Sequence, residues 1–207
     1  MSNPRFPIAV LVSGSGSNLQ AILDATRDPT YAATTVVVIS DRPGVRALER
    51  AAEAGVAVEV VDWRAYDDRA AFSTAVVDAA ERHGAEALVL AGFMRILSPG
   101  AVDRFHNRIV NIHPALLPSF PGAHPVADAL DYGVTVTGVT VHFVDHDVDH
   151  GPIIVQEAVP VLPDDDEGSL LTRIHAVEHR LLPAVVDRLA RGGYRVKGRH
   201  VFIQEGI

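Results

Sequence analysis

The stretch "IAVLVSGSGSNLQAI" (residues 8–22) joins a short apolar run to a helical pattern through a turn that contains two glycines. An apolar run rich in β-branched residues is typical of a strand that is covered on both faces of a parallel sheet. Glycines in the turn let backbone N–H groups come close to an anion at the N-terminus of the next helix. The stretch therefore predicts the first strand, turn and helix of an α/β fold, with a possible anion-binding turn between them.

The same alternation continues along the chain. Strands are predicted at residues 8–12, 34–40, 56–61, 86–92 and 108–113, and helices at 18–26, 44–54, 67–82 and 98–105. Alternating strands and helices imply βαβ units, in which neighbouring strands run parallel. Ser98 is expected to be the N-cap of the fourth helix, with Pro99 at its first position.

The C-terminal part has a different pattern. Two longer strands are predicted at 135–144 and 152–161, and we expect them to be antiparallel. A helix over 166–191 follows, opened by the acidic run "DDDE", which suits a helix N-terminus. A last strand at 199–204 is expected at the edge of the sheet. We predict one α/β domain over residues 1–207, a Rossmann-like open, mostly parallel sheet with helices on both faces and antiparallel strands in its C-terminal part.

The composition restricts the class of function. Lys and Arg total 18 against 26 Asp and Glu, a net charge of −8 that argues against nucleic-acid binding. The sequence contains no cysteine, which excludes disulfides, thiolate catalysis and cysteine-ligated zinc. No apolar run approaches the about 20 residues that a membrane span needs. We therefore expect a soluble, cytoplasmic protein with no nucleic-acid or membrane partner, and a homodimer is left open.

The glycine turn does not match either common nucleotide motif. The dinucleotide fingerprint needs a third small residue where Leu19 stands, and the Walker pattern needs a Gly-Lys-Ser/Thr that is missing. Asp41 at the end of the second strand would suit an NAD ribose, but it lies far beyond Gly14 and the glycine pattern is already broken. The turn is interpreted as a site for a single phosphate group, with a plain tight turn as the alternative.

Two polar segments are candidates for chemistry. Asn111 and His113 end the strand at 108–113 and are followed by three prolines in "NIHPALLPSFPG", an arrangement that a core strand does not need. The segment "HFVDHDVDHGP" (142–152) could hold a metal ion, although its histidines lack the helical i, i+4 spacing of a zinc site. Alternatively, one of its three aspartates pairs with His113 and raises the pKa of the imidazole. The pattern alone leaves all three aspartates as candidate partners of His113.

Five segments, taken together and in order, resemble the glycinamide ribonucleotide formyltransferase family. They are "SGSGSNLQAI", "VLAGFMRILSP", "NIHPALLPSFPG", "TGVTVHFVDHDVDHGPI" and "EHRLLP", and the resemblance covers roughly residues 8–185. It implies transfer of the formyl group of 10-formyltetrahydrofolate, as co-substrate, to the amine of a phosphoribosyl glycinamide in purine biosynthesis. It implies no metal.

The resemblance also implies site residues. The catalytic residues would be Asn111, His113 and Asp149. The ribonucleotide would be bound by Gly16, Ser17, Asn18, His175, Ala176, Val177 and Glu178. The folate would be bound by Arg69, Met94, Arg95, Ile96, Leu97, Asn111, Asp145, His146, Asp147, Val148 and Asp149. The peptide bond before Pro118 is expected to be cis.

A mechanism follows for these residues. Asn111 would donate a hydrogen bond to the oxyanion of a tetrahedral intermediate. A protonated His113 would do the same and would move protons between the amine and the leaving nitrogen, with Asp149 holding its charge and orientation. Two positions depart from the family pattern: Val126 stands where many members have histidine, and His150 where a small residue is usual.

Four other functions remain as alternatives. Methionyl-tRNA formyltransferase shares the core but has a further C-terminal domain, and the acidic charge suits tRNA poorly. Formyltetrahydrofolate deformylase carries an added N-terminal domain. A regulatory nucleotide-binding module would not need Asn111, His113 and Asp149 in one cleft, and a metal hydrolase would use the His/Asp segment as ligands.

Overall fold

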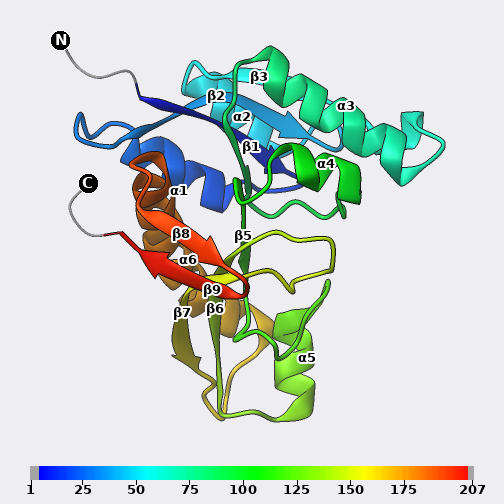
Figure 1. Cartoon of the computed structure of the whole chain (residues 1–207). Coiled ribbons are helices and arrows are strands. Elements are labelled where there is room, and N and C mark those ends of the chain that lie inside the picture. The colour runs from blue at the N-terminus through cyan, green and yellow to red at the C-terminus, as the bar shows by residue number, and fades with distance from the viewer. Residues whose placement is uncertain (1–4, 205–207) are drawn as a thin grey trace.

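The computed structural model describes residues 5–204 and forms a nine-stranded sheet in this part of the chain (Figure 1). The strands are β1 (Phe6–Val12), β2 (Ala33–Ser40), β3 (Ala57–Val60), β4 (Ala87–Leu90), β5 (Ile109–His113), β6 (Val136–Phe143), β7 (Ile153–Pro160), β8 (Tyr194–Lys197) and β9 (His200–Ile203). The helices are α1 (Ser17–Ala25), α2 (Arg46–Glu53), α3 (Arg69–Arg82), α4 (Pro99–Arg104), α5 (Pro125–Tyr132) and α6 (Glu167–Ala190), with a 3₁₀ turn at Trp63–Ala65.

The sheet has the order β3-β2-β1-β4-β5-β6-β7-β9-β8. The first five strands in that order are parallel, and β6 and β7 are antiparallel to their preceding neighbours. The chain moves outward from β1 to β3 and then returns to place β4 on the other side of β1. This reversal is a topological switch point, where open α/β sheets bind ligands at the carboxyl ends of their strands. The predicted fold class is confirmed.

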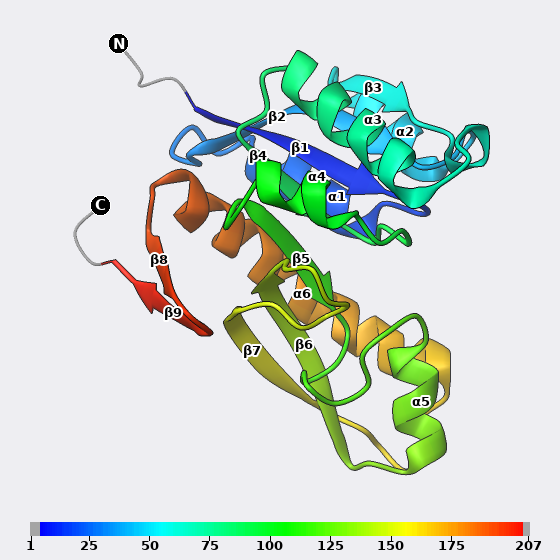
Figure 2. The same ribbon diagram turned by 45° about the vertical axis from the view of Figure 1, so that its right-hand side comes forward.

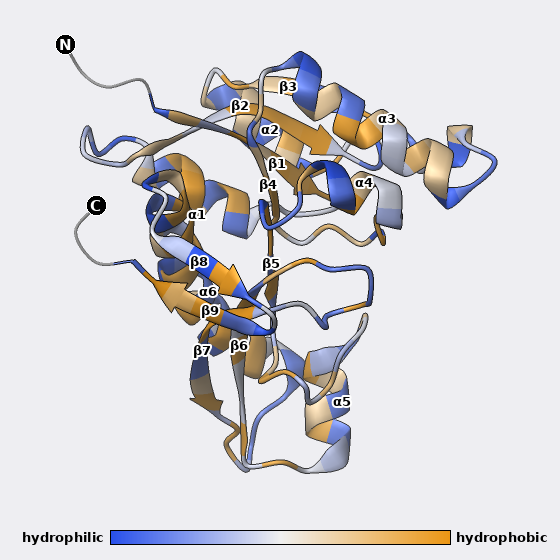
Figure 3. Ribbon diagram, in the orientation of Figure 1, coloured by the Kyte–Doolittle hydropathy of each residue, from blue (hydrophilic) through white to orange (hydrophobic). Residues whose placement is uncertain are grey.

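Alternating side chains of each central strand pack on opposite faces of the sheet. In β1, Ile8, Val10 and Val12 belong to the core beneath α1 and α6, whereas Ala9 and Leu11 belong to the core beneath α3 and α4. All five are fully buried. Figure 2 shows the helices on both faces, and in Figure 3 the central strands are largely hydrophobic while α3 alternates. This double coverage explains the near-continuous apolar runs in the sequence.

Two helix starts follow their sequence signals. Ser98 is the N-cap position of α4 and Pro99 is its first residue, as predicted, although the Ser98 side chain makes no capping bond. Helix α6 begins with a capping box, in which Asp166 accepts from the Ser169 N–H at 2.7 Å and the Ser169 hydroxyl accepts from the Asp166 N–H at 3.1 Å. Such a box satisfies two otherwise unpaired donors of the first turn. The cis bond between Leu117 and Pro118 is also present, as expected.

Three elements differ from the sequence-based expectation. Helix α5 was not predicted, although Pro125 at its start and the left-handed Gly133 at its end are typical helix boundaries. Strand β8 was also missed, because an alternation of only four residues is too short to identify a strand and its partner β9 is supplied by a hairpin. Consequently β9 is not the edge strand; it lies between β7 and β8. No helix within residues 5–204 combines the length and apolar character needed to cross a membrane.

Candidate active site

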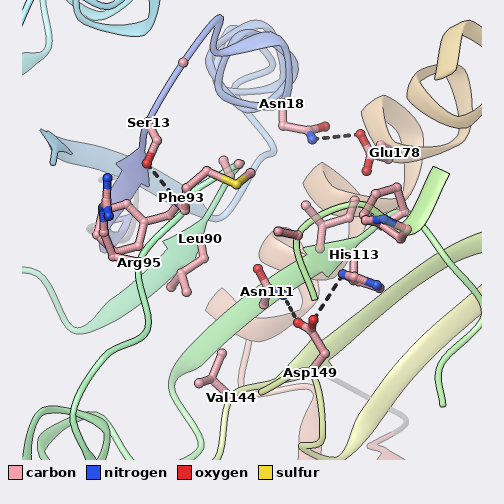
Figure 4. A pocket seen from close by; sticks show the side chains of 18 of the residues that line it. Ser13, Asn18, Leu90, Phe93, Arg95, Asn111, His113, Val144, Asp149 and Glu178 are labelled. Carbon is pink, nitrogen blue, oxygen red and sulfur yellow. Dashed lines mark hydrogen bonds and ion pairs between the residues drawn. The ribbon is translucent and has the colours of Figure 1, made fainter. Parts of the chain in front are cut away.

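A cavity of about 580 Å³ opens at the switch point, at the carboxyl ends of β1, β4 and β5 (Figure 4). Its walls come from the turn after β1, the loop after β4, the end of β5 and the loop between β6 and β7. Helix α6 closes one side with Leu171, His175 and Glu178. Segments far apart in sequence are therefore brought together because parallel strands end at the same edge of the sheet.

The glycine turn places the N-terminus of α1 in the cavity. Gly16 is the N-cap residue, in the left-handed conformation with φ 72°, and no side chain caps the helix. Gly16, Ser17 and Asn18 all line the cavity. The first N–H groups of a helix have no partner within the helix, and the helix dipole makes this end positive. The turn has the geometry of an anion site.

Gly16 is expected to be the glycine on which this turn depends. A Cβ at Gly16 would lie 2.7 Å from the Ala47 Cβ and 2.8 Å from its Cα, in a backbone conformation that side chains rarely adopt. Gly16→Ala should therefore separate the turn from α2 and cost about 1–3 kcal/mol of stability. The melting temperature and the affinity for inorganic phosphate should both fall in this variant. Gly14→Ala is the matched control, since nothing lies within 4 Å of that Cβ; equal losses in both variants would contradict the prediction.

The three predicted catalytic side chains meet in the cavity. His113 Nδ1 lies 3.4 Å from Asp149 Oδ2, and Asn111 Nδ2 donates to Asp149 Oδ1 at 3.3 Å. The Gly122 N–H donates to Asp149 Oδ2 at 2.8 Å. Asp149 is thus the aspartate that faces His113. Asp145 instead contacts His150, with 2.8 Å between Oδ2 and Nδ1.

Burial decides the charge of His113. The ring donates from Nε2 to the Phe120 carbonyl oxygen at 2.8 Å, because a carbonyl can only accept. Desolvation lowers the pKa of His113, and the Phe120 hydrogen bond and the Asp149 charge do not offset it. Asp149 does act to raise the pKa of the ring, as expected, but burial lowers this pKa by more, so the net shift is downward. In the neutral ring the proton is on Nε2, and Nδ1 is free to accept one.

Asp149 remains ionised. Burial alone would raise the pKa of its carboxyl, but the hydrogen bonds around it, among them that from the Gly122 N–H, outweigh burial and lower the pKa below its usual value. A carboxylate therefore lies beside a neutral imidazole. Such a pair can stabilise a proton that arrives at the ring during a reaction.

His142 was not predicted as part of this cluster. It faces Asn111 across the β5–β6 pairing and is 2% exposed. Its Nδ1 donates to the Phe143 carbonyl at 2.8 Å, so Nε2 accepts from Asn111 Nδ2 at 3.1 Å. Both N–H groups of the Asn111 amide then have acceptors, His142 Nε2 and Asp149 Oδ1. The sequence does not show the register of β5 against β6, which places Asn111 and His142 opposite each other.

A second buried carboxyl lies at the other end of the cavity. Glu178 of α6 accepts from Asn18 Nδ2 at 2.9 Å, across 160 residues of sequence, and is 4% exposed. Burial raises the pKa of Glu178 to about 7, against the opposing effect of Asn18. Within the described residues, Asn18 Oδ1 is buried without a hydrogen-bond partner. Both groups are available to a ligand with hydroxyl donors.

The remaining predicted residues divide into two groups. Those that line the cavity are Met94, Arg95, Ile96, Leu97, Asp145, Asp147, Val148 and His175. Those that do not are Arg69, His146, Ala176 and Val177. Arg69 is exposed at the start of α3, and His146 contacts Asp103 of α4 at 2.8 Å. Val126 is buried in the core, so its departure from the family pattern concerns packing.

Asp41 has a structural partner that the sequence did not reveal. Its carboxylate is fully buried and accepts from Arg95 Nε at 2.8 Å. The Arg95 guanidinium lies 4.1 Å above the Trp63 ring, which stabilises its position by a cation–π contact. Since Asp41 is already engaged, it is not free to bind a nucleotide ribose.

Metal ligation has no support in the described part of the chain. Residues 5–204 contain no group of three or more His, Asp or Glu side chains that could hold a metal ion. The three histidines of the segment 142–152 point in different directions, since His142, His146 and His150 each contact a different neighbour.

The fold and the cavity define an α/β protein in which an anion-binding helix N-terminus and a buried Asn–His–Asp cluster share one ligand site. The chain belongs to the formyl transferase family, whose model matches residues 6–186. It is 50% identical over 192 residues to phosphoribosylglycinamide formyltransferase from Mycobacterium tuberculosis, covering 93% of this chain and 88% of that protein. The resemblance to this family is confirmed.

Structural similarity agrees with this membership. The crystal structure of glycinamide ribonucleotide transformylase 1 from Symbiobacterium toebii matches with a TM-score of 0.95 and 46% identity, covering 98% of this chain and 96% of that one. The trifunctional purine biosynthetic protein adenosine-3 of Bos taurus is 46% identical over 200 residues. This chain spans a fifth or less of the length of the trifunctional relatives.

Proposed function

We propose that this protein transfers the formyl group of 10-formyltetrahydrofolate to the amine of glycinamide ribonucleotide, a step of purine biosynthesis. The observation that carries the proposal is the meeting of Asn111, His113 and Asp149 in a cavity that also contains the N-terminus of α1. Relatives named phosphoribosylglycinamide formyltransferase support it. One sheet-and-helix unit carries all of these residues, which suits a single domain.

The ribonucleotide would occupy the end of the cavity between α1 and α6. Its phosphate would accept from the N–H groups of Gly16, Ser17 and Asn18. The ribose hydroxyls would donate to Glu178, whose buried carboxyl otherwise has Asn18 as its donor. Hydroxyl donors favour the ionised carboxylate, so this binding would bring the raised pKa of Glu178 back down.

The folate would occupy the other end, between the loop after β4 and the loop between β6 and β7. Met94, Ile96 and Val148 line this end and are about half exposed to solvent. Exposed apolar side chains that converge on a cavity indicate a ligand with an apolar body. The flat heteroaromatic ring of a folate fits this description. The amine and the formyl group would then meet beside Asn111 and His113.

The chemical step would use His113 as base and then as acid. As the amine nitrogen attacks the formyl carbon, neutral His113 takes a proton at Nδ1. Asp149, still ionised, stabilises the imidazolium that forms. The tetrahedral intermediate collapses when the carbon–nitrogen bond to the folate breaks and His113 returns the proton to that nitrogen. Asn111 would redirect one amide donor, away from His142 or Asp149, toward the oxyanion.

Acceptor dependence tests the proposal. With 10-formyltetrahydrofolate, tetrahydrofolate should appear rapidly only when glycinamide ribonucleotide is added, because the amine is the nucleophile. Inorganic phosphate should compete with the ribonucleotide and not with the folate. Rapid release of formate without acceptor would indicate a hydrolase instead. A homodimer, cytoplasmic location and the absence of a metal requirement stay predictions from the sequence.

A further inference from the structure

The loop between β6 and β7 forms the folate side of the cavity and carries Asp149, yet its own backbone does little to hold it. Residues 145–151 contain a local turn at 148–149 but make no backbone-to-backbone hydrogen bond to another segment of the described structure. The flanking bonds end at Val144, which donates to Ile109, and at Pro152, which accepts from Phe143. Segments with few backbone bonds open at low free energy. The position of this loop therefore depends on side-chain contacts.

One such contact comes from the C-terminal hairpin, beyond the residues matched by the family model. Arg199, in the turn between β8 and β9, donates from one terminal nitrogen to the His150 carbonyl oxygen at 2.7 Å. Its other terminal nitrogen lies 3.0 Å from His150 Nε2. Figures 1 and 2 both show the tip of this hairpin beside the loop. Arg199 thus supplies the loop with a donor that its own backbone lacks.

His150 in turn contacts Asp145. Its Nδ1 lies 2.8 Å from Asp145 Oδ2, and because a carboxylate only accepts, Nδ1 carries the proton. The Arg199 nitrogen near the ring lies 3.0 Å from Nε2 and 3.2 Å from Nδ1, so the guanidinium lies against the imidazole. Asp145 accepts in addition from the Asp147 N–H at 3.1 Å. Guanidinium, imidazole and carboxylate are therefore in contact one after another along the loop.

The hairpin that carries Arg199 is attached to the sheet and to the main core. Strand β9 pairs with β7 at Ile153–His200, and the Tyr194 ring meets the Phe143 ring edge-on with 6.1 Å between centroids. Val196 and Val201 pack against the main core. The hairpin is therefore part of the sheet, whereas the loop that it holds is not.

We propose that Arg199 and His150 act as a clasp that holds the loop 145–149 in its folate-binding position. Both are positioning residues: neither lines the cavity, but Asp145, Asp147 and Val148 do. The proposal rests on the proposed function, because it names the folate as the ligand whose binding depends on the clasp. It also gives a role to His150, which departs from the family pattern.

The test compares Arg199→Ala with Arg195→Ala, its matched control in the same hairpin. Arg195 lies over the Phe202 ring at 5.3 Å and makes no hydrogen bond to the loop. Each contact between exposed side chains contributes little free energy. Loss of the Arg199 contacts should therefore lower, but not abolish, the fraction of molecules whose loop is in the folate-binding position. We therefore expect Arg199→Ala to raise the KM for the formyl folate about three- to tenfold. The KM for the ribonucleotide and the melting temperature should stay as in the control.

His150→Ala keeps the backbone carbonyl that Arg199 contacts, so its effect should be the smaller of the two. Arg199→Lys should restore part of the affinity. A folate KM within twofold of wild type for Arg199→Ala would overturn the clasp, as would equal rises in both KM values with a lower melting temperature. If the wild type transfers no formyl group, the proposed function fails first. Calorimetric titration of the same variants with tetrahydrofolate then tests the clasp by itself.

Discussion

His113→Ala is expected to lower kcat by about 10²–10⁴-fold, because a positioned acid/base contributes on this order. In the proposed mechanism, the neutral His113 ring accepts the proton of the attacking amine at Nδ1. Ribonucleotide and folate binding should change much less, because the proposed phosphate, ribose and folate-ring contacts lie at the two ends of the cavity, away from His113. Steady-state kinetics with both substrates varied gives kcat and the two KM values separately.

Asp149→Asn tests whether the pair acts as one unit. It removes the charge that would stabilise the imidazolium and retains most of the volume. It should lower kcat heavily, and the double variant should be barely worse than either single one, because residues that act together are not additive. His124→Ala is a control, since this exposed histidine lies in the same loop region but outside the cavity. Near-native kcat in His113→Ala would remove His113 from the mechanism, and losses that multiply would show independent roles.

The pH dependence of kcat/KM should follow the same pair. Because burial lowers the pKa of His113, the basic form persists to a lower pH than in an exposed histidine. Asp149→Asn removes an effect that raises this pKa, so it should move the His113-dependent acid limb to still lower pH. Glu178 also titrates near neutral pH and would affect ribonucleotide binding. The pH profile should therefore be measured with the ribonucleotide at saturation, so that it reports His113.

Glu178→Gln is expected to stabilise the fold at high pH while weakening ribonucleotide binding. The ordinary pKa of the carboxyl is 4.5, and burial raises it to about 7 in the folded protein. Between these values the folded state keeps a proton that the unfolded state has lost, so the free energy of unfolding falls as pH rises. The full shift corresponds to about 3 kcal/mol. The variant has no charge to bury, so its advantage over wild type should grow by up to that amount between pH 4 and pH 8.

Binding should change in the opposite direction. Ribose hydroxyls would donate to a carboxylate in the wild type, and a hydrogen bond to a charged group contributes about 1.5–3 kcal/mol. The KM for the ribonucleotide should therefore rise about 10- to 100-fold, with the folate KM nearly unchanged. Glu167→Gln, at an exposed position of the same helix, is the control for stability and binding. A variant that loses stability with rising pH as the wild type does would show that Glu178 is not the buried titrating group.

The sequence by itself determined the alternation of strands and helices, the doubly covered sheet and the positions of the polar segments. These features are local: "IAVLV" is apolar on both faces, glycine permits the turn after it, and Ser98–Pro99 marks a helix start. Motif order also indicated the family. Helix α5 and strand β8 were missed, because short elements depend on tertiary partners more than on their own pattern.

Only the tertiary structure decided which polar residues meet. By residue pattern alone, three aspartates were equal candidates for His113, and only the family resemblance pointed to Asp149; the loop path after β6 places Asp149 against the ring. The pairing of β5 with β6 brought His142 to Asn111, and the packing of α6 on α1 brought Glu178 to Asn18 across 160 residues. The tertiary structure also decided the balance between burial, which lowers the pKa of His113, and the charge of Asp149, which raises it. Desolvation and long-range charge depend on everything that surrounds a side chain in three dimensions, and a linear pattern does not contain that information.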